Sequence, residues 1–139
     1  MVTRADKHTS LEGVLEFYSD VPINFDRNPV TGNLAKIINE DAVKASLRDL
    51  ILTDKGERLF SPTAGSKLRS LLFELSTSVT RENIKTTILQ ACSAEPRASI
   101  IEVDVQDDSA HNLYRVSIVF TIVNATSPIQ LDVIVKRVR

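Results

Sequence analysis

The sequence is poor in the residues that most often carry metal-binding or nucleophilic chemistry. Its 139 residues include one cysteine, two histidines and no tryptophan. A single cysteine excludes an internal disulfide, and no cluster of Cys and His has the spacing of a metal site, so we expect no cofactor. Cys92 falls on the apolar face of a predicted helix, where we interpret it as a small core residue rather than a nucleophile.

Net charge and long apolar runs are equally scarce. The formal net charge is -1, from 17 basic and 18 acidic side chains, so no global positive field favours nucleic acid. We interpret the basic run from Lys136 to Arg139 as a solvated tail, because it offers few phosphate contacts. No apolar run approaches the ~20 residues of a membrane span, and the N-terminus lacks an apolar signal core. We expect a soluble protein, made in a reducing cytosol, that binds neither nucleic acid nor a membrane.

A catalytic constellation is also missing from the sequence. His8 and His111 lie in an arm and in a turn, without an acid and a nucleophile at a suitable spacing. Gly56 and Gly65 are too far apart to form a phosphate-binding loop. Three glutamates could supply the carboxyl pair of a glycosidase, but nothing in the sequence pairs them: Glu57, Glu74 and Glu95. We therefore expect a protein without enzymatic activity.

The length and the 42% hydrophobic content indicate one domain, 17–139, preceded by a polar arm, 1–16. Two amphipathic helices are predicted, one capped by Asn39 and one by Thr80 or Ser78. Their buried faces are Val43, Leu47, Leu50 and Ile51 in the first, and Ile84, Ile88, Ala91 and Cys92 in the second. A short helix between them, capped by Ser66, has the predicted buried stripe Leu68, Leu71, Leu72 and Leu75.

Apolar residues alternate with polar ones in three runs after Pro96. The predicted inward faces are Ile101, Val103 and Val105; Tyr114, Val116, Ile118, Phe120 and Ile122; and Ile129, Leu131, Val133 and Val135. Three such runs separated by turns indicate an antiparallel meander with one apolar face. The predicted fold is therefore α+β, with two to three helices packed on a three-stranded antiparallel β-meander.

Glu95-Pro96-Arg97 lies where the second helix gives way to the first strand. On the structural interpretation, Pro96 stops the helix and the two charges are merely exposed. On the functional interpretation, the tripeptide is a rigid corner that presents a carboxylate and a guanidinium to a partner. Both interpretations remain open at this point.

The last strand offers a second candidate surface. A meander in sequence order leaves its first and third strands as edges, and a free edge can accept a strand from another chain. The candidate residues are Gln130, Asp132, Ile134 and Lys136. The alternative is that the polar residues among them simply protect the edge from aggregation.

A long loop, 53–65, separates the first helix from the short one. Loops of this length in a compact domain are often functional. Arg58 in this loop is a weaker candidate contact, because an exposed ion pair with Glu57 or Asp54 would explain it equally well.

Several motifs occur in a shared order over residues 18–136. They are Tyr18-Ser19-Asp20, the passage from Leu50 to Arg58, Pro62, Gly65, Leu72-Phe73-Glu74 and Glu95-Pro96-Arg97. On these motifs the chain resembles the baseplate wedge and sheath-initiator family of contractile phage tails, which includes a baseplate component of type VI secretion systems.

The resemblance implies a structural role in a virion baseplate that is assembled in the host cytoplasm. It implies that Glu95 and Arg97 dock on the helical core of the wedge proteins, with Pro96 setting the angle. It also implies that the small sheet accepts strands from tail sheath subunits, with tail tube and hub proteins as further candidate partners. The family often carries a lysozyme label, which no acid–nucleophile pair in this sequence supports.

Two alternative functions remain beside this one. The first is a cell-wall hydrolase, to which the lysozyme label points. The second is a regulatory binding module, because a bacterial anti-adaptor of the stress response is similar to this fold and acts by sequestering one partner.

Overall fold

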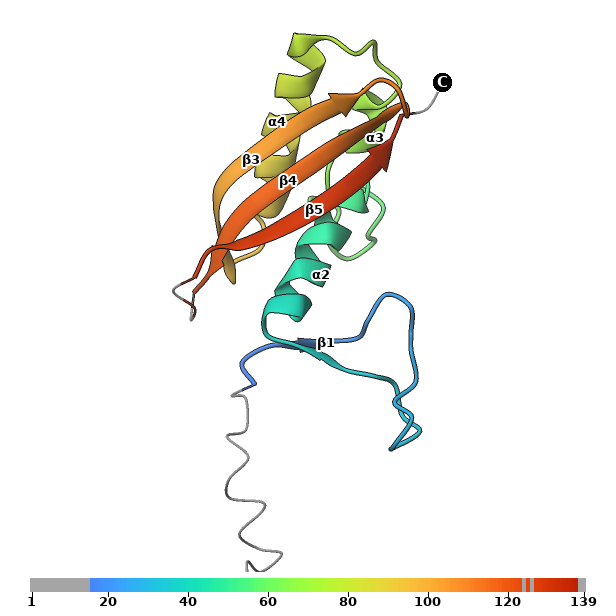
Figure 1. Ribbon diagram of the computed structural model, residues 1–139, viewed down its shortest axis with the longest axis vertical. Coiled ribbons are helices and arrows are strands. Elements are labelled where there is room, and N and C mark those ends of the chain that lie inside the picture. The colour runs from blue at the N-terminus through green and yellow to red at the C-terminus, as the bar shows by residue number, and fades with distance from the viewer. Residues whose placement is uncertain (1–15, 124, 126, 138–139) are drawn as a thin grey trace, which may run out of the picture.

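The computed structural model describes residues 16–123, 125 and 127–137, and shows three helices and five strands within them. The predicted arm, 1–16, lies outside the described residues except for Glu16. In chain order the elements are β1 (Ser19–Asp20), β2 (Ile37–Ile38), α2 (Glu40–Leu52), α3 (Leu68–Leu71), α4 (Ser78–Cys92), β3 (Ala98–Asp108), β4 (Leu113–Ile122) and β5 (Ile129–Lys136). Figure 1 shows the main sheet lying across α2 and α4, with the β1–β2 pair at one end.

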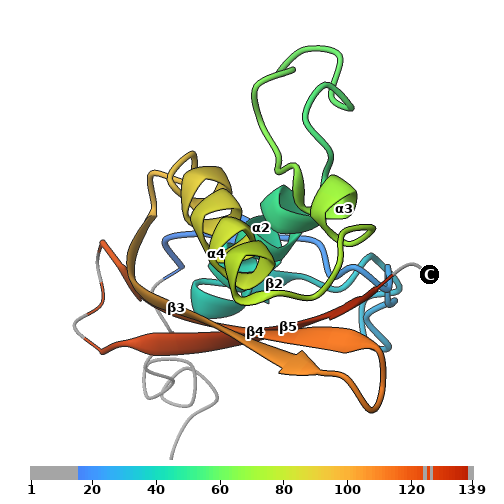
Figure 2. The same cartoon turned by 90° about the horizontal axis from the view of Figure 1, so that it is seen from above.

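The main sheet is the predicted antiparallel meander, in the order β3-β4-β5. Figure 2 shows the three helices of the described residues on one face of this sheet, and none of these helices covers the opposite face. The α+β prediction is therefore confirmed. This arrangement explains the alternation in the sequence, because only one face of each strand meets the helices.

The core lies between the sheet and the inner faces of α2 and α4. All five predicted inward residues of β4 are buried, and so are the predicted faces of α2 and α4. Among the described residues, five leucine, isoleucine and phenylalanine side chains have no exposed surface: Leu47, Ile84, Ile88, Ile118 and Phe120. Each such side chain contributes about 1.5–3 kcal/mol by leaving water. This core fixes the position of both candidate surfaces.

Two predicted core residues lie at the surface instead. Ile101 is 60% exposed because a β-bulge between Ile100 and Glu102 inserts an extra residue into β3 and shifts the alternation. Leu75 is 79% exposed because α3 spans only Leu68–Leu71, so the chain leaves its helical path before Leu75. Leu68 and Leu72 are buried as predicted, although Leu72 is the C-cap of α3, and Leu71 is half-buried against the core.

The helix caps differ from the prediction in detail. The cap of α4 is Thr77 rather than Thr80 or Ser78, and its hydroxyl oxygen accepts the backbone N–H of Thr80 at 3.1 Å. Asn39 does stand at the start of α2, but its side-chain oxygen accepts the N–H of Phe17 at 2.9 Å and makes no capping bond. Asn39 therefore holds the N-terminal segment against α2. The N-cap of α3 is Lys67 rather than the predicted Ser66, although the Ser66 hydroxyl oxygen accepts the N–H of Leu68 at 3.1 Å.

The loop between α2 and α3 projects from the helical side of the molecule (Figure 2). Its base is closed by a parallel bridge between Asp54 and Ser66 and by the Ser66 N–H bonding the carbonyl of Thr53 at 2.8 Å. Gly65 has φ +112°, and a Cβ there would lie 2.6 Å from the Thr53 carbonyl oxygen. Only glycine fits this close approach, so the base of the loop depends on residue 65.

Candidate functional site

The tripeptide Glu95-Pro96-Arg97 forms the turn that carries the chain from α4 into β3. Backbone bonds from Glu95 N–H to Cys92 O at 3.0 Å and from Ala98 N–H to Glu95 O at 3.4 Å hold this turn. Pro96 lies on the outer side of this turn and is exposed to solvent. The helix itself stops at Cys92, and Pro96 prevents it from resuming because the proline ring disfavours helical backbone at the preceding residue. The corner is thus a rigid turn with one exposed proline.

The Glu95 carboxylate points inward, where it is only 6% exposed. Arg97 donates from Nε to Oε1 at 2.7 Å and from Nη2 to Oε2 at 2.8 Å, and the Ser46 hydroxyl donates to Oε2. The expectation that the corner presents an exposed carboxylate is therefore wrong. A buried carboxylate needs such partners because burial without them is costly.

The hydrogen bonds from Arg97 lower the pKa of Glu95 from 4.5 to about 2. Burial acts in the opposite direction, and the bond from Ser46 adds to the lowering. Glu95 in turn raises the pKa of Arg97, so both groups stay charged at neutral pH. The pair behaves as one fixed structural unit between α4 and β3.

Arg97 also reaches the N-terminal segment. Its side chain is 30% exposed, and its guanidinium carbon lies 5.5 Å from the centre of the Tyr18 ring, a cation–π arrangement. Ser46 comes from α2 and Tyr18 from the segment leading into β1. The corner therefore joins three parts of the chain, and the surface it leaves to a partner consists of Pro96 and the outer part of Arg97.

The second candidate surface is the outer edge of β5. Arg137 N–H bonds the carbonyl of Asn112 at 3.0 Å, and the same register continues from Lys136–Leu113 to Ile129–Phe120. Hydrogen-bonded and non-bonded pairs alternate along an antiparallel ladder. The odd-numbered residues of β5 therefore bond to β4. The N–H and C=O groups that point away from β4 belong to Gln130, Asp132, Ile134 and Lys136.

These four residues form one exposed row, and within the described residues no other segment pairs with it. Their side chains lie on the sheet face that carries no helix. Gln130 donates to the Ser117 hydroxyl at 2.9 Å and to Asp132 Oδ1 at 3.0 Å, and its bond lowers the pKa of Asp132. Ile134 is 61% exposed. Hydrogen bonds therefore hold Gln130 and Asp132 in place at one end of the row, and the apolar Ile134 lies between Asp132 and Lys136.

The other edge of the sheet, β3, is less regular. The bulge between Ile100 and Glu102 breaks its row of backbone groups, and bulges are a common way to protect an edge from pairing. Of the two edges, β5 is therefore the better template for an added strand.

Arg58 lies in the loop between α2 and α3 and is exposed. The ion pairs found among the described residues do not include it: Asp54 faces Arg69 at 3.5 Å, and Glu57 Oε2 accepts the N–H of Asp54 at 2.9 Å. The structure brings Arg58 neither to the corner nor to the β5 edge. It remains a separate candidate contact.

Reactive groups are few in the described part of the chain. Cys92 is buried, and burial raises the pKa of its thiol to about 11, which fits a core residue. His111 bonds Asp108 at 2.9 Å in an exposed turn. No group of three or more His, Cys, Asp or Glu among the described residues could hold a metal ion. None of the described helices is long and apolar enough to cross a membrane.

Sequence reasoning missed two residues that complete the corner. Ser46 is 49 positions from the carboxylate it contacts, and Tyr18 lies in a segment without clear periodicity. Neither serine nor tyrosine carries a local signal for such a contact.

The fold and its surfaces define a small α+β domain with a hydrogen-bonded helix–strand corner and a regular, unpaired edge on β5. A family model described as baseplate wedge protein gp25 matches residues 39–126. The chain belongs to this baseplate wedge family.

Two solved structures share the fold. A candidate tail lysozyme from Geobacter sulfurreducens aligns with a TM-score of 0.68 and 19% identity, over 76% of this chain and 98% of that one. A chain of the anti-feeding prophage baseplate aligns with a TM-score of 0.66 and 26% identity, over 79% of this chain and 89% of that one. A comparison with curated proteins found no match. The first likeness shows the fold alone, because its identity is so low.

Proposed function

We propose that the chain is a structural protein of a contractile-tail baseplate, which docks on wedge proteins through its corner and starts the sheath at its sheet edge. Membership of the baseplate wedge family and the likeness to the anti-feeding prophage baseplate support the structural baseplate role. The protein would then act in the tail of a virion or phage-like particle, after assembly in the host cytoplasm.

The observation that carries the sheath proposal is the free row of backbone groups on β5. Four residues direct their N–H and C=O groups away from β4, over a strand of eight residues. An incoming extended segment can pair with all of these groups, which gives affinity through the backbone alone. The sheath protein is the proposed donor of this segment.

A proline at Ile134 tests this directly. Ile134→Pro removes one outward N–H and places a ring at the edge, while the ladder to β4 keeps its bonds. We expect assembled baseplates with at least tenfold fewer sheaths, counted by electron microscopy. Ile134→Thr is the matched control, because it removes the apolar side chain but keeps the N–H. Normal sheath numbers with Ile134→Pro would contradict the proposal.

The docking proposal rests on the corner in its corrected form. Glu95 acts by fixing Arg97, and the partner meets Pro96 and the outer part of the guanidinium. Arg97→Lys keeps a positive charge but loses the planar fork. We expect this variant to fold and to recover less of the wedge proteins in co-purification. Recovery equal to wild type would assign Arg97 a purely structural role. Arg58→Ala, away from the corner, tests the loop contact separately.

One of the two similar structures bears a lysozyme name, so hydrolysis is the second candidate function. A turbidity assay on purified peptidoglycan distinguishes it from the structural role. We expect no clearing above a buffer control. Clearing that Glu95→Gln or Glu57→Gln abolishes would replace the structural proposal, and capture of a single regulator in a pull-down would favour the regulatory alternative.

A further inference from the structure

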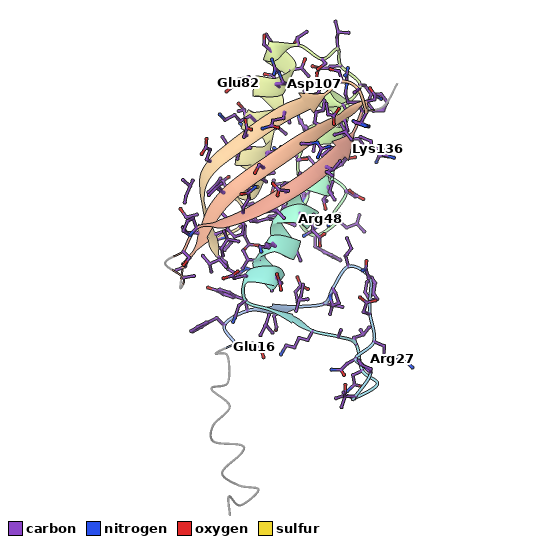
Figure 3. All side chains as sticks on the ribbon, viewed as in Figure 1. Glu16, Arg27, Arg48, Glu82, Asp107 and Lys136 are labelled. Atoms are coloured by element: carbon purple, nitrogen blue, oxygen red, sulfur yellow. The ribbon has the colours of Figure 1, made fainter. Side chains whose placement is uncertain are left out.

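Helix α2 runs beneath the free edge of β5 and extends beyond this edge, on the side away from β4. In Figure 1, α2 emerges from under β5 on the side away from β4. Figure 3 labels Arg48 on this stretch of α2, next to the outer edge of β5. Ala45, Arg48 and Leu52 share one side of the helix, being three and four positions apart. The space over these residues is where the inward side chains of an added fourth strand would lie.

Two hollows open at this edge, one under each end of β5. The larger, of about 520 Å³, lies between α2 and the segment 20–25 and is bounded on β5 by Leu131. The smaller, of about 180 Å³, lies between α2 and α3 and is bounded on β5 by Val135. Apolar side chains contribute to both walls: Val21, Pro22, Ile23 and Phe25 in the larger, and Leu52, Leu68 and Leu72 in the smaller.

The spacing of the two hollows matches the period of a strand. Leu131 and Val135 are four residues apart on the inward face of β5, roughly 13 Å along the strand. Residues on one face of a strand recur every second position, so a neighbour strand aligned with β5 also has inward residues four apart. Two of them can enter the two hollows at once.

We propose that the β5 edge and the hollows beneath it form one binding groove for an extended segment with two apolar side chains four residues apart. The bulkier side chain enters the hollow at Leu131, and a short aliphatic one enters the hollow at Val135. The unpaired backbone groups of β5 hold the bound segment in an extended conformation, and the two hollows select which side chains it carries. This inference rests on the proposed function, since the segment is a strand donated by another protein of the assembly.

The free edge and the hollows point to the same occupant independently. Unpaired N–H and C=O groups require an extended backbone beside them. The hollows contain partly exposed apolar groups, among them Ile23 at 60%, Phe25 at 69% and Leu52 at 48%, whose burial by a ligand is favourable. Lys44, Arg48 and Asp49 also line the larger hollow, so a polar residue next to the bulky side chain can hydrogen-bond there. An extended segment with alternating apolar residues satisfies both requirements.

Labelled synthetic peptides of about eight residues, the common length of a strand, test the groove. One peptide carries a leucine and a valine four positions apart among threonines and lysines. The other has the same composition with the two apolar residues three positions apart, so that both cannot face inward. We expect the full chain to bind the first peptide at least tenfold more tightly in fluorescence anisotropy. Equal binding of the two peptides, or binding of neither, would overturn the groove.

A matched pair of variants tests whether the smaller hollow determines the preference for the first peptide. Leu52→Lys places a charge in the smaller hollow, whereas Leu89→Lys makes the same change at a similarly exposed leucine on α4, outside both hollows. We expect Leu52→Lys to remove the preference for the first peptide and Leu89→Lys to preserve it. A preference unaffected by Leu52→Lys would overturn the proposal, and so would a dimer of the full chain that Leu52→Lys dissociates, since the groove would then hold a second copy.

Ile134→Pro separates this inference from the proposed function. If it blocks sheath assembly while the two peptides bind equally to the wild-type chain, the edge accepts a strand and only the sequence selection fails. If sheath assembly is normal with Ile134→Pro, the proposed function fails as well.

Discussion

Arg97 and Glu95, two residues apart on either side of Pro96, form a bidentate ion pair whose two N–O distances are 2.7 and 2.8 Å. The geometry matters because the carboxylate is buried and the guanidinium is partly exposed. The pair therefore shapes the surface without itself being fully available to a partner. Changes at the corner must be separated into effects on folding and effects on docking.

Arg97→Ala should destabilise the isolated chain. It leaves the buried carboxylate of Glu95 with Ser46 as its remaining side-chain partner, and the free energy of unfolding should fall by about 2–4 kcal/mol. Adding Glu95→Gln should recover part of this loss, because a neutral amide is less costly to bury. Urea denaturation gives the free energy of unfolding of the wild type, of Arg97→Ala and of the double variant. Arg115→Ala is the control, since its ion pair with Asp108 is exposed and should cost within about 0.5 kcal/mol. Equal losses for Arg97→Ala and Arg115→Ala would contradict the structural role of the pair.

The same pair predicts a pH dependence of stability. The pKa of Glu95 is about 2 in the folded chain against 4.5 ordinarily, so folding favours the charged form. Its contribution is complete above pH 4.5 and is lost as the pH falls toward 2. The loss is at most about 3 kcal/mol, reduced by solvent around Arg97. The difference in unfolding free energy between wild type and Glu95→Gln should therefore shrink across this range in acid titrations.

The other carboxyls with lowered pKa values, Glu16, Asp108 and Asp132, occur in both proteins and cancel in that difference. A difference that stays constant from pH 5 to the onset of acid unfolding would show that Glu95 does not depend on its charge. The acid limb of the wild-type profile alone cannot supply this test, because all lowered carboxyls contribute to it.

The sequence predicted those parts of the fold that follow from local periodicity. Tyr114 to Ile122 alternates without interruption, and all five inward residues are buried. The same rule failed at Ile101, because a bulge adds one residue without any local marker. It also failed at Leu75, since a leucine stripe does not reveal where a short helix stops. Alternation thus gives the faces of elements but not their interruptions.

The candidate surfaces were predictable to different degrees. The β5 edge follows from strand order and alternation, both visible in the sequence. The inward turn of Glu95 does not, because it depends on Ser46 and Arg97 meeting the carboxylate in the folded chain. A charged residue beside a proline is ordinarily exposed, and only tertiary contacts decide otherwise.

The two glycines that frame the loop between α2 and α3 give the last prediction, because they differ in one respect. Gly56 has φ +89° and Gly65 has φ +112°, so alanine is strained at both. At Gly56 the added Cβ meets nothing within 4 Å, whereas at Gly65 it meets the carbonyl oxygens of Thr53 and Asp54 at 2.6 and 3.1 Å.

Gly56→Ala should therefore lower the free energy of unfolding by about 1–2 kcal/mol, the cost of the left-handed backbone alone. Gly65→Ala should lower it by about 3 kcal/mol or more, because the backbone must also move at the base of the loop, where the Ser66 N–H bonds Thr53 O at 2.8 Å. Denaturant titration of both variants gives the comparison, and limited proteolysis should cut the loop of Gly65→Ala faster. Equal destabilisation would mean that the base of the loop yields easily, and that the projecting loop is not held rigidly by its close backbone approach.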